Sequence, residues 1–428
     1  MSNQIWFTFL CIFEACSSLS TLEEAREFLI AFNKSKYYED ITLRTALMNL
    51  YGKFGRIDNA RMVFDEMLYH DVVSWNAMIG AYAQNGHDKK ALELFHKMSG
   101  HGIMPTCITF VSTLDACSGL LDLEEGFQFH ANCVLLAYED DISIGNALVN
   151  MYGKCGFLHE AIDSFSRIHR HNVVSWTAVI GGYVQVGKGH EALDLFGKMQ
   201  QTNVKPNAFT FMTALNACAM IGATEEGKQI HFYLVDIGLE LDAFVNSALI
   251  DMYSKSGSLV DARKFLEKTS SKNVVCWSAM IAGYALYGDG EEVLRLASRM
   301  QEEGIPLNHI TFIHILSACS HTGLLDVCLY YFDVMRRVYG ISPSPEHFAC
   351  VVDSFGRAGN LKKAAMMAKT MPSSPSAVVW RAFLGACRVR GDVKRAKYAA
   401  EQVIKIEPDD PAALVLLSNS YAAEGRWE

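Results

Sequence analysis

The segment Val72–Gly86, VVSWNAMIGAYAQNG, returns twice along the chain, each time 101 residues later. It reads VVSWTAVIGGYVQVG from Val173 and VVCWSAMIAGYALYG from Val274. A period this strict indicates an array of repeats in which each unit buries its apolar face against its neighbours. The chain has 428 residues, 50% of them apolar, and in such an array they need no single large core.

Each cycle divides into three units of 35, 31 and 35 residues. A long unit carries Thr-Phe and Ala-Cys, a short unit carries a Tyr-Gly-Lys or Tyr-Ser-Lys pattern, and a plain unit opens with Val-Val. The three cycles begin at Trp6, Cys107 and Ala208. Variant units follow at His309–Ser344, Pro345–Ser376 and Ala377–Asp410, and a further unit opens at Pro411. Its second helix is missing before Glu428, so we expect a truncated chain.

Each unit has the pattern of two helices joined by a tight turn. In the first plain unit Val72, Trp75 and Ile79 fall on one helical face. A glycine at the fifteenth place then ends the helix in the left-handed conformation. This glycine recurs as Gly55, Gly86, Gly156, Gly187, Gly257, Gly288, Gly323, Gly359, Gly391 and Gly425. The second helices carry a small residue where two helices approach closely, as at Ala91 and Ala192. The fold class is therefore all-α, a superhelix of helix-turn-helix repeats.

Charge and cysteine usage narrow the function. The net charge of −9 opposes a nonspecific grip on phosphate backbones, so any nucleic-acid binding must be local and directed at bases. The twelve cysteines form no CxxC motif, and four of them share one place of the long units, which predicts reduced core thiols. These four are Cys16, Cys117, Cys218 and Cys319.

The apolar run Ile5–Phe13 is too short to cross a bilayer and lies in register as a first helix.

The mixture of long, short and plain units with VVSWNAMI, GNALVNMYGKCG and TFVSTLDACS resembles the plant pentatricopeptide repeat family. It is similar to the subclass that mixes these three motifs, whereas tetratricopeptide arrays keep a uniform period of 34 residues. We expect the array to span residues 6–376, and residues 377–428 resemble the extension motifs of organellar RNA-editing factors. The resemblance implies a right-handed superhelical solenoid, no cofactor, and a mitochondrial or chloroplast location, although no transit peptide is visible.

The resemblance also implies that one RNA base is read per unit by the fifth residue and the last residue. The fifth residue is polar in the plain and short units, namely Thr45, Asn76, Asn146, Thr177, Ser247 and Ser278. It is apolar in the long units, namely Leu10, Val111, Met212 and Ile313. The last residues of the reading units are Asp71, Thr106, Asn172, Asn207, Asn273 and Asn308. Exposure on a helix face and helix N-capping are ordinary alternative explanations for these two sets.

By the family's pairing rules, Thr45 with Asp71 favours G, and Asn76 with Thr106 weakly favours a pyrimidine. Asn146 with Asn172 favours a pyrimidine, with C ahead of U. The pairs that begin at Thr177, Ser247 and Ser278 each favour A. The predicted RNA is 5′-G-Y-N-Y-A-N-A-A, with an unread base at each long unit. The residues that sandwich the bases in this family correspond to Val73, Val174 and Val275, for which ordinary packing is an equally good explanation.

Chemistry by the chain itself is not expected. A zinc deaminase needs HxE and CxxC, and neither motif occurs in the sequence. We expect a noncatalytic adaptor without metal that binds single-stranded organellar RNA and recruits a deaminase, directly or through a small editing-factor partner, by residues 377–428. The alternative is a helical-repeat scaffold for a protein or peptide, which the acidic charge favours. The division of the fifth residues by class favours RNA, because a peptide groove gives no reason for it.

Overall fold

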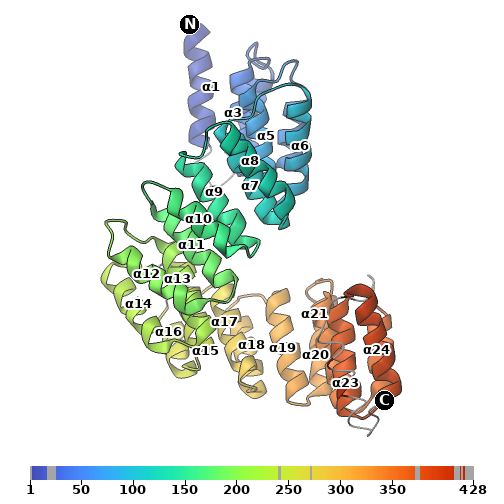
Figure 1. The fold of residues 1–428 in the computed structure, drawn as a ribbon. Helices are drawn as coiled ribbons and strands as arrows, with labels where there is room; N and C mark the ends of the chain where they lie inside the picture. Colours follow the sequence, from blue (N-terminus) through green and yellow to red (C-terminus); the bar gives the residue numbers. More distant parts are fainter. Residues whose placement is uncertain are drawn as a thin grey trace. The chain divides into compact units, whose positions relative to one another are not determined.

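The computed structural model describes residues 2–16, 26–239, 242–269, 272–371, 376–408, 415, 418 and 419. Within these residues it contains 24 α-helices and no strand (Figure 1). The chain divides inside α13 into two compact parts, Met1–Ala217 and Cys218–Glu428. Each part is a stack of helix-turn-helix units, so the all-α solenoid of helical repeats is confirmed.

The first helices of the units begin where the repeat register predicts, except α1, which begins at Ser2 instead of Trp6. Their bounds are α1 Ser2–Cys16, α3 Ile41–Lys53, α5 Val72–Gln84, α7 Cys107–Leu120, α9 Ile142–Lys154, α11 Val173–Gln185, α13 Ala208–Ile221, α15 Ala243–Lys255, α17 Val274–Leu286, α19 His309–His321, α21 Pro345–Arg357 and α23 Ala377–Val389. The helix α1 covers the apolar run that we expected to be a first helix. The predicted unit from Pro411 lies almost entirely outside the described residues.

The second helices follow after short turns. Their bounds are α2 Arg26–Asn33, α4 Ile57–Asp65, α6 Asp88–Gly100, α8 Leu123–Leu135, α10 Leu158–Arg167, α12 Gly189–Gln200, α14 Thr224–Asp236, α16 Leu259–Lys268, α18 Gly290–Glu302, α20 Leu325–Arg337, α22 Leu361–Lys369 and α24 Val393–Ile406. The second helices of the short units, α4, α10 and α16, have 9 or 10 residues, whereas those of the plain units, α6, α12 and α18, have 12 or 13, because the short units have 31 residues instead of 35.

In each part the first helices pack side by side in chain order. In the first part α3, α5, α7, α9 and α11 contact one another in that order, and in the second part α15, α17, α19, α21 and α23 do so. Within each part, second helices such as α6 and α18 pack against the first helices of their own units, and most second helices also touch the next first helix (Figure 1). The first helices therefore form one layer of each part and the second helices form the other.

The turn between the two helices uses the left-handed backbone conformation. Gly86 has a φ of 71° and Gly187 a φ of 81°, and the same sign holds for the other predicted turn glycines except Gly425, which lies outside the described residues. In the first complete long unit this place is held by Leu121, whose φ is 57°. A leucine there bears the steric cost that a glycine avoids, on the order of 1–2 kcal/mol.

Small residues and thiols fill the contacts between helices. Ala91 and Ala192 are fully buried in α6 and α12, at the predicted points of close approach. Cys117, Cys218 and Cys319 are buried among apolar side chains, as predicted for core thiols. Burial raises the pKa of Cys218 to about 12 and that of Cys319 to about 11. Such thiols stay protonated at neutral pH and are poor nucleophiles.

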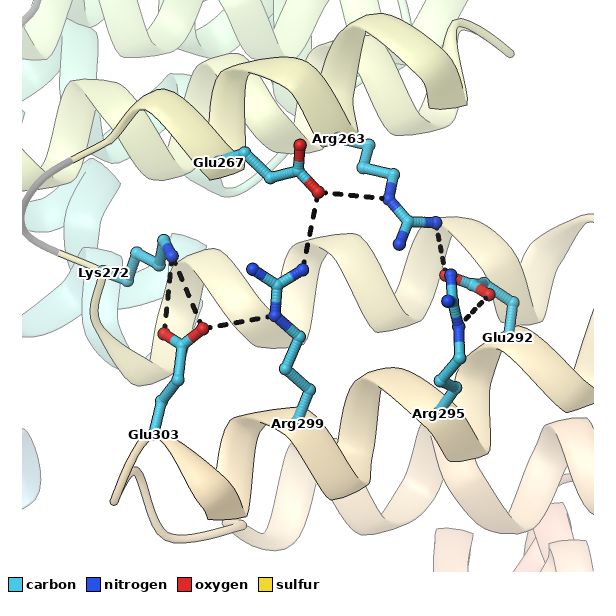
Figure 2. Close-up of polar contacts among 7 residues, drawn as sticks. All are labelled: Arg263, Glu267, Lys272, Glu292, Arg295, Arg299 and Glu303. Atoms are coloured by element: carbon cyan, nitrogen blue, oxygen red, sulfur yellow. Dashed lines mark hydrogen bonds and ion pairs between the residues drawn. The ribbon is translucent and has the colours of Figure 1, made fainter.

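The second helices α16 and α18 are joined by a chain of ion pairs (Figure 2). Glu292 accepts from Arg263 at 2.6 Å and from Arg295 at 2.7 Å. From Arg263 the chain of ion pairs continues through Glu267 to Arg299. It ends at Glu303, which pairs with both Arg299 and Lys272. Four cationic and three anionic side chains take part, so most of the charge on this surface is neutralised within the network.

Candidate nucleic-acid interface

A groove of the first part lies along the first helices α7, α9 and α11. It has a volume of about 780 Å³ and is open to solvent. Four predicted reading residues line it, namely Asn146, Asn172, Thr177 and Asn207. Val174, one of the predicted sandwiching residues, lines it as well. The repeat register thus brings polar side chains from successive units to one surface.

The fifth residues with hydroxyl groups all bond to their own helix. Thr45, Thr177, Ser247 and Ser278 donate to the carbonyl oxygen four residues earlier, at 2.7 to 2.9 Å. Because each hydroxyl carries one proton, its oxygen is then left as an acceptor. Thr45 is only 5% exposed and Ser278 only 8%. The fifth place is therefore a semi-buried position between helices rather than an exposed helix face.

The last residues of the units cap the next first helix. In Asn172, Asn207, Asn273 and Asn308 the Oδ1 atom accepts the backbone N–H of the third residue of that helix, at 2.9 to 3.0 Å. In Asp71 Oδ1 accepts from the N–H of Ser74 at 2.8 Å. Capping is therefore confirmed as one role of these residues, and it fixes which atom of each side chain faces the helix.

Capping leaves the second terminal atom of each side chain unused. Among the described residues, Nδ2 of Asn172, Asn207, Asn273 and Asn308 makes no hydrogen bond. An asparagine cap therefore offers a donor, whereas an aspartate cap such as Asp71 offers a carboxylate oxygen as an acceptor. Asn and Asp therefore form the same helix cap, but Asn presents a hydrogen-bond donor to a ligand and Asp presents an acceptor.

The two positions together define patterns that complement base edges. A fifth-residue oxygen beside an asparagine amide is an acceptor next to a donor, which matches the N6–H donor and N1 acceptor of adenine. The pair Thr45 and Asp71 presents two acceptors, which match the N1–H and N2–H donors of guanine. This physical pattern agrees with the predicted preferences for A and G. The same acceptor and donor also fit cytosine, so the size of the space must separate A from C.

The pairs that begin with asparagine are partly self-satisfied. Asn76 donates from Nδ2 to Oγ1 of Thr106 at 3.0 Å, so these two reading residues contact each other. Asn146 donates to Oδ1 of Asn172 at 3.4 Å, and its own Oδ1 is buried without a partner among the described residues. To bind a base, these amides must give up their hydrogen bonds to Thr106 and Asn172. This cost agrees with the weak pyrimidine preference predicted for Asn76.

The third residue of the next unit completes the arrangement. Thr109, Thr210 and Thr311, each fully buried, contact the fifth residues Asn76, Thr177 and Ser278 at 2.6, 2.8 and 3.0 Å. The short units, which follow the long units with apolar fifth residues, carry apolar third residues instead, namely Leu43, Ile144 and Val245. The division of fifth residues by class therefore has a packing reason as well, so it does not by itself separate RNA from peptide.

The second residue of the units is exposed and apolar. Val73, Val174 and Val275 are 57%, 53% and 51% exposed, so their predicted positions are accessible to a base. The family resemblance pointed to this place only in the plain units. Ile108, Phe209, Phe244 and Ile310 occupy the same place in long and short units and are also exposed. Phe209 lines the groove, and its position in the repeat could have identified it.

Other kinds of site are not seen in the described part of the chain. No three His, Cys, Asp or Glu side chains of the described residues gather in a way that could hold a metal ion. No helix among the described residues is long and apolar enough to cross a membrane.

Family models match most of this architecture. The PPR repeat family model matches residues 70–119, 171–220 and 272–321, and the PPR repeat model matches 44–72, 146–173 and 247–274. The E motif model matches residues 390–428. The repeat matches cover the short and plain units of the three cycles and the first helix of the long unit that follows each plain unit. The chain belongs to the pentatricopeptide repeat family and carries an E motif.

Curated relatives are similar along nearly the whole chain. The mitochondrial pentatricopeptide repeat-containing protein At3g02330 of Arabidopsis thaliana is 38% identical over 97% of this chain and 48% of its own length. The chloroplastic protein At1g11290 of the same plant is 37% identical over 99% of this chain and 52% of its own length. The chain thus spans about half the length of these relatives.

Solved structures with this likeness include the pentatricopeptide repeat protein PPR10 from maize, with 15% identity and a TM-score of 0.44. It covers 98% of this chain and 72% of its own. The complex of PPR10 with an 18-nt psaJ RNA element has 20% identity and a TM-score of 0.39, over 98% of this chain and 66% of its own.

Proposed function

We propose that this chain is a sequence-specific adaptor that binds single-stranded RNA of a plant organelle and specifies sites of C-to-U editing. The observation that carries the proposal is the pairing of a fifth residue with a capping residue at the groove of the first helices. The cap leaves one terminal atom of each asparagine unused and accessible to a ligand. A row of such pairs, one in each plain and short unit, suits a strand whose bases are read one at a time.

The groove also suits a nucleic-acid strand in its other features. Val174 and Phe209 offer apolar surface on which a base can stack. Lys154 lies in the same groove and can neutralise a phosphate, despite the net negative charge of the chain. Electrostatic contacts with the phosphates of the RNA are therefore local, and the affinity for RNA depends on contacts with its bases.

The finer parts of the proposal rest on the family. RNA appears in the name of the PPR10 complex, and the Arabidopsis relatives are named as mitochondrial or chloroplastic. The E motif at residues 390–428 lies within the segment 377–428, which we assign to recruiting a deaminase or a small editing-factor partner. In this proposal the chain is noncatalytic and the cytidine to be edited lies a few nucleotides downstream of the site.

Asn207→Asp is the direct test of base reading. Aspartate keeps the helix cap but replaces the donor of Nδ2 by an acceptor, so the preference at the fifth nucleotide of 5′-G-Y-N-Y-A-N-A-A should move from A to G. The change should be on the order of 10-fold in relative affinity, equivalent to about 1–3 kcal/mol for one base. It is measured by gel shift with RNAs that differ only at that nucleotide.

Asn132→Asp is the matched control, because Asn132 is exposed on the second helix α8 and the substitution adds the same charge. It should lower the affinity for all RNAs slightly and leave the base preference unchanged. Equal binding of the wild-type chain to all four bases at the fifth nucleotide would refute base reading. Selective capture of a peptide in the same groove would instead support the scaffold alternative.

A further inference from the structure

We propose that the third residue of each long unit is a positioning residue for the base read by the preceding plain unit. The inference rests on the proposed function and concerns Thr109, Thr210 and Thr311. These threonines belong to units whose own fifth residues are apolar and read no base in our scheme. The reading group is thus a set of three side chains that spans two units.

The bonds of Thr210 show how the set is built. Its Oγ1 lies 2.8 Å from Oγ1 of Thr177 and 3.0 Å from Oδ1 of Asn207. It also accepts the backbone N–H of Asn207 at 3.3 Å. One buried hydroxyl therefore fixes the fifth residue and the capping residue of the same unit relative to each other.

The same bridge occurs at the other two junctions between a plain and a long unit. Thr311 lies 3.0 Å from Oγ of Ser278 and donates to Oδ1 of Asn308 at 2.8 Å. Thr109 donates to Oδ1 of Asn76 at 2.6 Å and lies 3.2 Å from Oγ1 of Thr106. All three threonines are fully buried, so no base can contact them directly.

The junctions between a short and a plain unit lack this double contact. Oγ of Ser74 donates to the backbone carbonyl of Asp71, and Oγ of Ser175 donates only to Oδ1 of Asn172. Cys276 has a thiol 3.4 Å from Ser247. Helix capping alone therefore does not require the bridge, because these helices are capped without it.

The bridge has a consequence for discrimination between bases. The backbone N–H of Thr210 holds Oδ1 of Asn207 whether or not the hydroxyl is present, so the cap survives its loss. The single proton of the hydroxyl is shared between Oδ1 of Asn207 and Oγ1 of Thr177, and its oxygen accepts the N–H of Asn207, so the hydroxyl restrains the plane of the Asn207 amide and hence the direction of Nδ2. Since base discrimination depends on that direction, loss of the hydroxyl should blur the preference at one nucleotide.

Thr210→Val tests the inference because valine has nearly the same shape and removes only the hydroxyl. The full chain is incubated with single-stranded RNA randomised at every nucleotide of the predicted site, and bound RNA is sequenced. The wild type should prefer A to G at the fifth nucleotide on the order of 10-fold. In Thr210→Val this ratio should fall to about twofold, while the ratio at the eighth nucleotide stays unchanged.

Three further variants separate positioning from stability. Thr210→Ser restores the hydroxyl and should restore the preference. Thr311→Val should flatten the eighth nucleotide and leave the fifth unchanged. Thr113→Val removes an equally buried hydroxyl that bonds only to its own helix, at the carbonyl of Phe110, and should change neither.

The outcomes are distinct. If the wild type discriminates at the fifth nucleotide and Thr210→Val discriminates equally well, Thr210 is a structural residue and this inference fails alone. If Thr210→Val loses the preference at every nucleotide, its role is to stabilise the fold, and the inference fails as well. If the wild type shows no base preference anywhere, the proposed function and this inference fail together.

Discussion

At the scale of single residues, one side chain serves both the fold and the groove. Asn207 caps the N-terminus of α13 with Oδ1 and leaves Nδ2 for a ligand. Thr177 satisfies its own helix with its proton and leaves its oxygen as an acceptor. Because the structural duty orients each side chain before a ligand arrives, little ordering remains to be done on binding.

His347 stands at the third place of the short variant unit, where the other short units have an apolar residue, and it predicts a pH dependence. Its Nδ1 accepts the N–H of Ser344 at 3.1 Å and its Nε2 lies 2.9 Å from the carbonyl oxygen of His309, so the neutral ring satisfies both contacts. Burial is the main cause that lowers the pKa of His347 below its usual value. The unfolded chain therefore binds more protons near and below pH 6.5, and stability falls as the pH falls through this range.

We expect the protection of α21 against amide hydrogen exchange, corrected for intrinsic rates, to fall between pH 7.5 and 5.5. The decrease should be at most about 1.4 kcal/mol per pH unit for this one histidine. His347→Gln does not titrate and should show a flatter dependence over the same range. Identical pH profiles for the two chains would rule out His347 as the group responsible.

At the scale of helices, neighbouring units are joined in two different ways. The first helices are joined by buried hydroxyl and amide contacts such as that between Asn76 and Thr109. The second helices α16 and α18 are joined at their surface by ion pairs (Figure 2). Buried contacts are insensitive to salt, whereas exposed ion pairs are screened by it. The two layers should therefore respond differently to ionic strength.

Glu292→Gln tests the surface layer. Hydrogen bonds from Arg295 and the charge of Arg263 lower the pKa of Glu292, so its carboxylate is ionised at neutral pH and stabilises the fold. Removing the charge should lower the free energy of unfolding by about 1 kcal/mol at low salt, because the site is a network with a largely buried carboxylate. Chemical denaturation at 0.05 M and about 1 M NaCl measures the loss, which should shrink at high salt.

Glu191→Gln is its counterpart one cycle earlier. Glu191 stands 101 residues before Glu292 and makes no ion pair among the described residues. Its neutralisation should leave the free energy of unfolding within about 0.5 kcal/mol of the wild type. An equal loss in both variants would mean that total charge, and not the ion-pair chain, sets the stability.

At the scale of the whole chain, contacts between neighbouring units make the array modular. Deleting residues 107–207 removes one complete cycle of 101 residues and joins Thr106 to Ala208, which opens a unit of the same class as Cys107. The third residue after the junction is again a threonine, so the bridge to Asn76 can re-form. Because stability in such arrays is approximately a sum over units and interfaces, we expect the shortened chain to fold.

The shortened chain should bind the shortened RNA 5′-G-Y-N-A-A, which has lost three nucleotides. Circular dichroism should show the same helical content per residue, and gel shifts should show that the full-length site and the shortened site exchange their rank. A folded deletion chain that still prefers the full-length RNA would contradict reading of one base per unit.

Much of this protein follows from the period of the chain alone. Each helix start, capping residue and turn glycine is specified by groups within a few residues of one another, so the sequence determined the helical units and their register. The sequence also placed Thr177 at the fifth position and Asn207 at the last position of their unit, the same positions as in the other reading units. The bridge through Thr210, the groove beside Phe209 and the ion pairs of Glu292 needed the tertiary structure. They join atoms of different helices, and the packing of one unit on the next decides which of those atoms come within hydrogen-bonding distance.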